Sequence, residues 1–156
     1  MAEESLNLVV FTLETNNDNY EYGIPIEQVY EITRPGKIIK LPGMPLFIEG
    51  VMNLRDNIIP IVDLKKRFSL GVTTAKDTTR IVIVQSNLQK YGIIVDDVSE
   101  IIPLDASSLA APPTLAGGIE AQYIMCLGKV NDRLIIALTM DKILTKTEED
   151  SLVNAV

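Results

Sequence analysis

The residues best suited to chemistry are few in this chain, and the commonest of them is missing. The 156 residues include no histidine and a single cysteine, Cys126. Without histidine, the chain lacks the usual general base, the usual partner of a nucleophilic serine or cysteine, and the commonest metal ligand. Cys126 lies in the apolar run 124–127, so we predict a buried and unreactive thiol. One cysteine cannot supply a zinc site or an intramolecular disulfide.

Carboxylates are the remaining candidates for catalysis or for binding a hard cation. Asp96 and Asp97 are consecutive at the end of an apolar stretch. Because consecutive strand residues point to opposite faces, this pair does not converge on one site. Asp63 ends another apolar stretch, and we interpret all three residues as turn and strand-end acids. The sequence therefore predicts a protein that is not an enzyme and that holds no cofactor and no metal.

The charge balance disfavours anionic partners. The formal net charge is −7, from 21 acidic and 14 basic residues. Nucleic acids and anionic membrane surfaces attract lysine and arginine, so we expect no nucleic-acid partner and no direct membrane insertion. The basic cluster Lys65-Lys66-Arg67 is predicted to be a solvated face after a strand. The N-terminus has no signal-peptide layout, and no apolar run reaches the roughly 18 residues that span a bilayer, so a cytoplasmic location is expected.

The elements that must position any site are short strands rich in branched aliphatic residues. A tight hairpin is expected at 55–57 and another at 131–132, with one short helical turn near 26–30. Polar residues 73–79 are typical of a linker, and an acidic start at Thr147 predicts a short C-terminal helix. We predict strands at 8–13, 20–24, 50–54, 58–64, 80–85, 91–95, 123–130 and 133–138.

An internal repeat organises these strands. Residues 22–32 align with 91–101, and residues 58–64 align with 134–140, in the same order in both halves. Two related small β-barrels of about five strands each are the simplest architecture that explains the repeat. We predict an all-β protein with an approximate first barrel at 6–72, a linker at 73–79, a second barrel at 80–145 and a C-terminal helix or tail at 146–156.

Residues 41–68 resemble the signature of the CheW family. The signature consists of a proline-bounded loop, a phenylalanine, a Gly-Val start, an Asn-Leu-Arg turn and an apolar strand that ends Pro-x-x-Asp-Leu. Here these parts are LPGMPLF at 41–47, Gly50-Val51, Asn53-Leu54-Arg55 and PIVDL at 60–64. The resemblance extends over roughly residues 6 to 145, and its motif is long and specific.

The resemblance implies a fold of two five-stranded barrels, SH3-like or OB-like, with strands partly exchanged between the halves. It also implies a non-enzymatic adaptor of chemotaxis. Proteins of this family bridge the cytoplasmic tips of methyl-accepting chemoreceptors and the regulatory domain of the histidine kinase CheA. The expected location is the cytoplasm, in membrane receptor arrays that the protein joins through its partners.

With the resemblance in hand, we predict a receptor-binding surface from two segments. Our hypothesis is that Glu31 pairs with Arg55, whose fork of donors suits a carboxylate, and orders the surface around Val29. For Val29, ordinary core packing is an equal alternative, and Gly50 is most simply a backbone requirement such as a bulge or a positive φ. Asp56 stands where the family usually has glycine, and it could compete for Arg55. The predicted surface residues are Val29, Glu31, Gly50, Asn53, Leu54, Arg55 and Asp56.

Two other classes of function stay open on the residues alone. Small β-barrels also bind nucleic acids, but the acidic net charge and the few aromatic residues count against that use. A hydrolytic or metal-dependent enzyme is disfavoured by the absence of histidine. The adaptor is the hypothesis that the resemblance favours.

Overall fold

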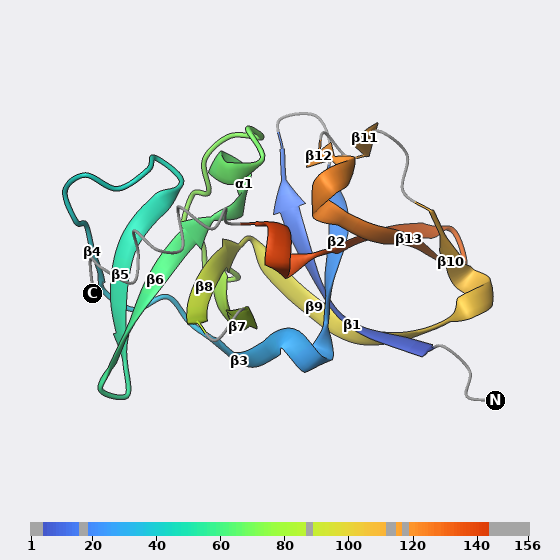
Figure 1. Ribbon diagram of the computed structural model, residues 1–156, viewed down its shortest axis with the longest axis horizontal. Helices are drawn as coiled ribbons and strands as arrows, with labels where there is room; N and C mark the ends of the chain where they lie inside the picture. Colours follow the sequence, from blue (N-terminus) through green and yellow to red (C-terminus); the bar gives the residue numbers. More distant parts are fainter. Residues whose placement is uncertain (1–4, 16–18, 87–88, 112–114, 117–118, 144–156) are drawn as a thin grey trace.

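The fold is built almost entirely from β-strands, in two large sheets joined side by side (Figure 1). The computed structural model describes residues 5–15, 19–86, 89–111, 115–116 and 119–143. This confirms the predicted all-β class. The predicted C-terminal helix lies outside the described residues.

The first sheet, called sheet A, has six strands in the order β10-β13-β14-β2-β1-β9 and lies on the right in Figure 1. Its strands are β1 (Ser5–Glu14), β2 (Asn19–Pro25), β9 (Asp97–Asp105), β10 (Leu109–Ala110), β13 (Ile124–Val130) and β14 (Arg133–Leu138).

The second sheet, called sheet B, has six strands in the order β3-β7-β8-β6-β5-β4 and lies on the left. Its strands are β3 (Val29–Thr33), β4 (Ile38–Ile39), β5 (Ile48–Leu54), β6 (Asn57–Asp63), β7 (Arg80–Ser86) and β8 (Gln89–Val95).

The remaining elements are short. A two-stranded sheet joins β11 (Leu115–Ala116) and β12 (Ile119–Glu120). The helical turns are η1 (Ile26–Gln28), α1 (Leu64–Arg67), η2 (Ala106–Ser108), η3 (Ala121–Tyr123) and η4 (Met140–Lys142). The turn expected near 26–30 is confirmed as η1, and the hairpins at 55–57 and 131–132 are confirmed as the β5–β6 and β13–β14 connections.

The two sheets exchange strands in a reciprocal way. Strands β1 and β2 leave the first half of the chain and pair with β9 and β14, while β7 and β8 pair with β3 and β6. The two parallel pairings, β2–β14 and β6–β8, lie where the exchanged strands join their host sheet. Sheet A therefore groups 5–25 with 97–138, and sheet B groups 29–95. The predicted division into a first barrel at 6–72, a linker at 73–79 and a second barrel at 80–145 stays a prediction.

The expected shape of each half needs correction. Each sheet has six strands instead of five, because the two-residue strands β10 and β4 extend the edges. Among the described residues, no pairing joins β10 to β9 or β4 to β3, so neither sheet is a closed barrel.

The apolar core has three parts, and the alternation of side chains along each strand explains them. On β7, Ile81 and Ile83 face a core that belongs to sheet B alone, while Val82 and Val84 face a core shared by the two sheets. On β14, Ile135 faces sheet A's own core and Ile136 faces the shared one. The inner strands are therefore apolar on both faces, as strands covered on both sides must be.

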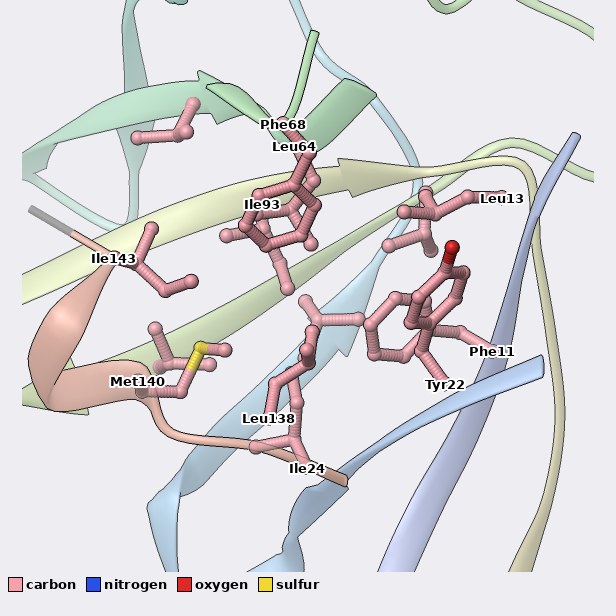
Figure 2. Packing of buried hydrophobic residues seen from close by; sticks show 14 of the residues in the cluster. Phe11, Leu13, Tyr22, Ile24, Leu64, Phe68, Ile93, Leu138, Met140 and Ile143 are labelled. Carbon is pink, nitrogen blue, oxygen red and sulfur yellow. The ribbon is translucent and has the colours of Figure 1, made fainter. Parts of the chain in front are cut away.

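The shared core joins the sheets (Figure 2). The rings of Phe11 on β1 and Tyr22 on β2 stack with their centroids 5.9 Å apart. Leu64 and Phe68, from α1 and the residue after it, approach from the side of sheet B. Because a fully buried large side chain contributes about 1.5–3 kcal/mol, this cluster supplies a large share of the stability.

Candidate functional site

The side chains of Arg55 and Glu31 form a two-pronged ion pair. Arg55 Nη1 donates to Glu31 Oε1 at 2.6 Å, and Nη2 donates to Oε2 at 2.8 Å. The Arg55 side chain is 70% exposed and that of Glu31 is 18% exposed. The predicted pairing of these two residues is confirmed.

The ion pair also reports the curvature of sheet B. Glu31 lies on the edge strand β3, and Arg55 lies in the turn between β5 and β6. Three strand spacings separate β3 from β6, which is about 14 Å in a flat sheet. A direct contact of two side chains across that span requires the sheet to bend toward itself.

The turn that carries Arg55 is a two-residue hairpin. Leu54 and Asn57 are register partners, and Arg55 and Asp56 between them have φ values of 49° and 72°. Positive φ at both central residues is the type I′ pattern, which matches the twist of the strands on either side. Asp56 thus takes a left-handed conformation where glycine is strain-free, and Arg55 bonds to Glu31 on the far strand.

Gly50 meets a strict backbone requirement. Its φ is 141°, and a β-carbon at this position would lie 2.2 Å from the carbonyl oxygen of Ile39 on β4. The register of β5 against β6 also shifts between Ile48 and Gly50. The backbone explanation of Gly50 is therefore confirmed, since a side chain here would clash with the backbone of the neighbouring strand β4.

The other predicted residues divide between surface and core. Asn53 is exposed on β5, and Leu54 is half-buried against sheet B's own core. Val29 is half-buried and packs against the shared core, so the core alternative for Val29 is supported. The structure brings Glu31 to the hairpin end formed by 53–56. We call Glu31 together with 53–56 the hairpin surface.

Sheet A carries a related ion-pair cluster that the sequence analysis missed. Arg133, the first residue of β14, binds Glu21 through Nε at 2.9 Å and Nη2 at 2.5 Å, and its Nη2 lies 2.9 Å from Glu100. The hydrogen bond from Arg133 lowers the pKa of Glu21 below its ordinary range. The repeat contained the signal, because Glu100 aligns with Glu31.

The prediction for Lys65-Lys66-Arg67 is wrong. These residues are the last three of the short helix α1, and Lys65 is buried. Lys65 pairs with Asp96 at 3.1 Å, and Lys66 pairs with Glu49 at 2.9 Å. A basic cluster after a strand is normally solvated, but here the short helix turns it back onto the protein.

Arg67 completes this inward-facing cluster. Its Nε donates to the carbonyl oxygen of Ile143 at 2.6 Å. Its guanidinium lies 4.6 Å from the ring centroid of Phe47 and 5.6 Å from that of Tyr123. The guanidinium is thus stacked between aromatic rings and is not a free surface charge.

Asp63 and Cys126, two of the groups considered for catalysis, have structural surroundings that account for them. Asp63 ends β6 and caps α1 by accepting from the Lys65 N–H at 3.0 Å, and it accepts from the N–H and hydroxyl of Thr73. Burial raises the pKa of the Cys126 thiol, which keeps it protonated. Within the described part of the chain, no cluster of His, Cys, Asp or Glu could hold a metal ion.

The described residues contain no helix that is both long and apolar enough to cross a membrane.

Comparisons with known proteins agree with this architecture. A family model described as the CheW-like domain matches residues 7–148. "Chemotaxis protein CheW" of Klebsiella aerogenes is 33% identical over 148 residues, which cover 95% of this chain and 86% of the relative. "Chemotaxis protein CheW" of Treponema pallidum is 32% identical over 156 residues, which cover 97% and 89%.

A solved structure is also similar. It is described as the crystal structure of scaffolding protein TtCheW from Thermoanaerobacter tengcongensis. The TM-score is 0.81 at 36% identity, and the match covers 93% of this chain and 91% of the other.

The exchanged two-sheet fold, the family match and the likeness to a solved scaffolding protein define a non-enzymatic scaffold. The chain belongs to the CheW-like domain family. It is an adaptor of chemotaxis signalling.

Proposed function

We propose that this protein couples the cytoplasmic tips of methyl-accepting chemoreceptors to the regulatory domain of the histidine kinase CheA. Membership of the CheW-like domain family supports the proposal. The single structural observation that carries it is the Arg55–Glu31 pair on the hairpin surface. On this proposal the protein works in the cytoplasm and joins receptor arrays through its partners.

The hairpin surface suits a helical partner. A helix bound on a protein surface needs apolar contacts and a few charges that fix its orientation. Next to the turn, Leu54 is half-buried against sheet B's own core, and Ile58 is 57% exposed on the opposite face of the hairpin. Asn53, the register partner of Ile58, adds an exposed amide.

Arg55 is the orienting charge in this arrangement. Two of its guanidinium nitrogens are held by Glu31, which fixes the plane of the group. An arginine has five N–H donors, so others stay available for a carboxylate or carbonyl of the partner. Because the group is ordered before binding, less conformational entropy is lost on complex formation.

Gly50 and Val29 support this surface from beneath. Gly50 lets β4 approach β5, and Val29 anchors the start of β3, two residues before Glu31. On this proposal, changes at these two positions act by moving the hairpin surface, while changes at Arg55 act on the partner directly.

The test is a titration of the purified protein against a receptor-tip fragment and against the regulatory domain of CheA, each alone and then together. Arg55→Glu should weaken binding to the receptor fragment at least about tenfold, because it places a carboxylate beside Glu31 and removes the donor fork. Binding to the kinase domain should change little.

Lys129→Glu is the matched control, since Lys129 is exposed on β13 of sheet A and the substitution makes the same charge change. Equal loss of receptor binding in both variants would show a general charge effect and contradict the assignment of the hairpin surface. Failure of the wild-type protein to bind either partner would refute the proposed coupling.

A further inference from the structure

A buried lysine and a buried aspartate meet where the two sheets join. Lys65 lies on α1, directly after sheet B's strand β6, and its side chain is 7% exposed. Asp96 is the residue between β8 of sheet B and β9 of sheet A, and its side chain is 1% exposed. Lys65 Nζ lies 3.1 Å from Asp96 Oδ2.

Both residues also hold the last residue of β1 in sheet A. Glu14 donates its backbone N–H to Asp96 Oδ2 at 2.7 Å, and its carbonyl oxygen accepts from Lys65 Nζ at 2.8 Å. The Asp96 backbone N–H donates to the carbonyl oxygen of Thr12 at 3.1 Å. The backbone N–H and carbonyl of Glu14 are therefore held by Asp96, at the junction of the two sheets, and by Lys65, which follows sheet B's strand β6.

Burying this ion pair costs free energy, and an apolar pair of the same size would fill the space without that cost. Buried ion pairs often add no stability over apolar residues of the same size, because both charges lose their water. The Asp96 Oδ1 atom accepts no hydrogen bond from the described residues, and Lys65 is the cation in direct contact with the Asp96 carboxylate. A pair kept at such a cost is best explained by the geometry that it imposes.

The remaining contact between the sheets is mainly apolar, and apolar contact is not directional. Tyr91 and Arg67 donate to the carbonyl oxygens of Met140 and Ile143, which joins sheet B to η4 and the residue after it. The exposed ammonium of Lys76, in the loop before β7, also donates to the carboxylate of Glu14. The Lys65–Asp96 pair differs from these because it is buried and holds both backbone groups of the last residue of β1.

We propose that Lys65 and Asp96 are positioning residues that hold sheet A and sheet B in one orientation. In the adaptor, this fixed orientation couples the binding of the receptor fragment to the binding of the kinase domain. The second statement rests on the proposed function, and the first does not.

The first measurement is of geometry alone. Spin labels at Gln85 on β7 and Lys129 on β13, both exposed, report the distance between the sheets in a Cys126→Ser background. Lys65→Met/Asp96→Asn removes both charges and keeps an acceptor for the Glu14 N–H. We expect this variant to stay folded and its distance distribution to widen about twofold, as packed layers slide when directional contacts are lost.

Lys66→Met is the matched control. Lys66 lies next to Lys65 on the same helix, but its ion pair is with Glu49 of β5, within sheet B. Lys66→Met should keep the wild-type distribution of distances between the two spin labels. If the double variant unfolds, Lys65→Arg, which keeps both charges and changes the geometry of their contact, is measured in the same way, and a smaller widening is expected.

The second measurement is the coupling between the two binding events. In the wild-type protein, a saturating receptor fragment should change the affinity for the kinase domain about fivefold or more, and the double variant should reduce this factor toward one while it still binds each partner alone. A purely structural role would lower both single affinities together.

An unchanged distance distribution in the folded variant overturns the positioning role, whatever the partners do. A widened distribution with coupling intact overturns the link to signalling. If the wild-type protein binds neither partner, the proposed function fails, and the distances still decide whether Lys65 and Asp96 set the orientation.

Discussion

Arg55 reaches from the β5–β6 turn across the curved sheet B to Glu31 on β3, and the two side chains meet through two parallel hydrogen bonds of 2.6 and 2.8 Å. The two residues belong to segments that are 24 positions apart in the chain. Their contact ties the end of the hairpin to the edge strand and gives an exposed guanidinium a fixed orientation.

The Arg55–Glu31 pair should contribute little to stability. In a double-mutant cycle with Arg55→Met and Glu31→Gln, the coupling free energy should be about 0.5–1 kcal/mol, because Arg55 is largely exposed and water screens the charges. Urea denaturation at low salt measures it, and the value should fall in about 1 M salt. A coupling above about 2 kcal/mol would mean that loss of binding in Arg55 variants reflects unfolding.

Gly50→Ala should destabilise the protein strongly. The new β-carbon would lie 2.2 Å from a backbone oxygen, at a φ of 141° that residues with side chains rarely adopt. We expect a loss of about 3 kcal/mol or more in the free energy of unfolding, measured by urea denaturation.

Gly43→Ala is the control for the Gly50 variant, since Gly43 has a φ of 81° and no atom within 4 Å of the position that a β-carbon would take. This change should cost about 1 kcal/mol, from backbone strain alone. Similar losses for the two variants would contradict the close approach of β4 to Gly50.

Asp56→Gly should leave the hairpin intact and slightly more stable. Asp56 has a φ of 72°, where a residue with a β-carbon is strained and glycine is not. The relief of strain is partly offset by the greater entropy of glycine in the unfolded chain, so a gain of up to about 1 kcal/mol is expected. Asp56→Val should instead lose about 1–2 kcal/mol. Urea denaturation of the two variants tests the sign of each change.

The stability of sheet A should depend on pH through Glu21. Its folded pKa lies below the ordinary value of 4.5 because Arg133 donates a hydrogen bond to the charged carboxylate. When the pH falls through 4.5, Glu21 of the unfolded chain takes up a proton first, so the stabilisation present at neutral pH is lost progressively. Arg133→Met should lower the free energy of unfolding at pH 7 by up to about 1 kcal/mol, and the difference from wild type should shrink in acid.

Arg80→Met is the control for this pH dependence, because Arg80 donates to the backbone carbonyls of Asp77 and Thr79 and these do not titrate. The difference in the free energy of unfolding between Arg80→Met and the wild type should be the same at pH 7 and in acid. An Arg133→Met difference that stays constant with pH would rule out the ion pair as its source.

Local patterns are enough to predict most elements of this protein. The β5–β6 and β13–β14 hairpins are each decided by a few neighbouring residues, and η1 follows the spacing of Ile26 and Val29. The Glu31–Arg55 pair is predictable only through the resemblance to the CheW family, because nothing in the local pattern brings a carboxylate on one strand to a turn 24 residues away.

Local patterns do not predict which strands pair with one another in the two sheets. In sequence, β1 and β2 precede β3 and look like part of the first half, yet they pair with β9 and β14. The two sheets have equivalent strands, so local preference is the same for either pairing, and the choice depends on contacts between residues far apart in the chain.

The sequence by itself determined the class, the strands and the absence of the usual catalytic groups, because these depend on residue types and on spacing over a few residues. Only the tertiary structure decided that the side chains of Lys65 and Asp96 are buried and form an ion pair. In the sequence, Lys65 is part of a basic cluster and Asp96 follows the end of a strand. Charged side chains in such positions normally stay in water. Packing sheet A against sheet B removes that water, and burial then requires each charge to meet the other and the end of β1.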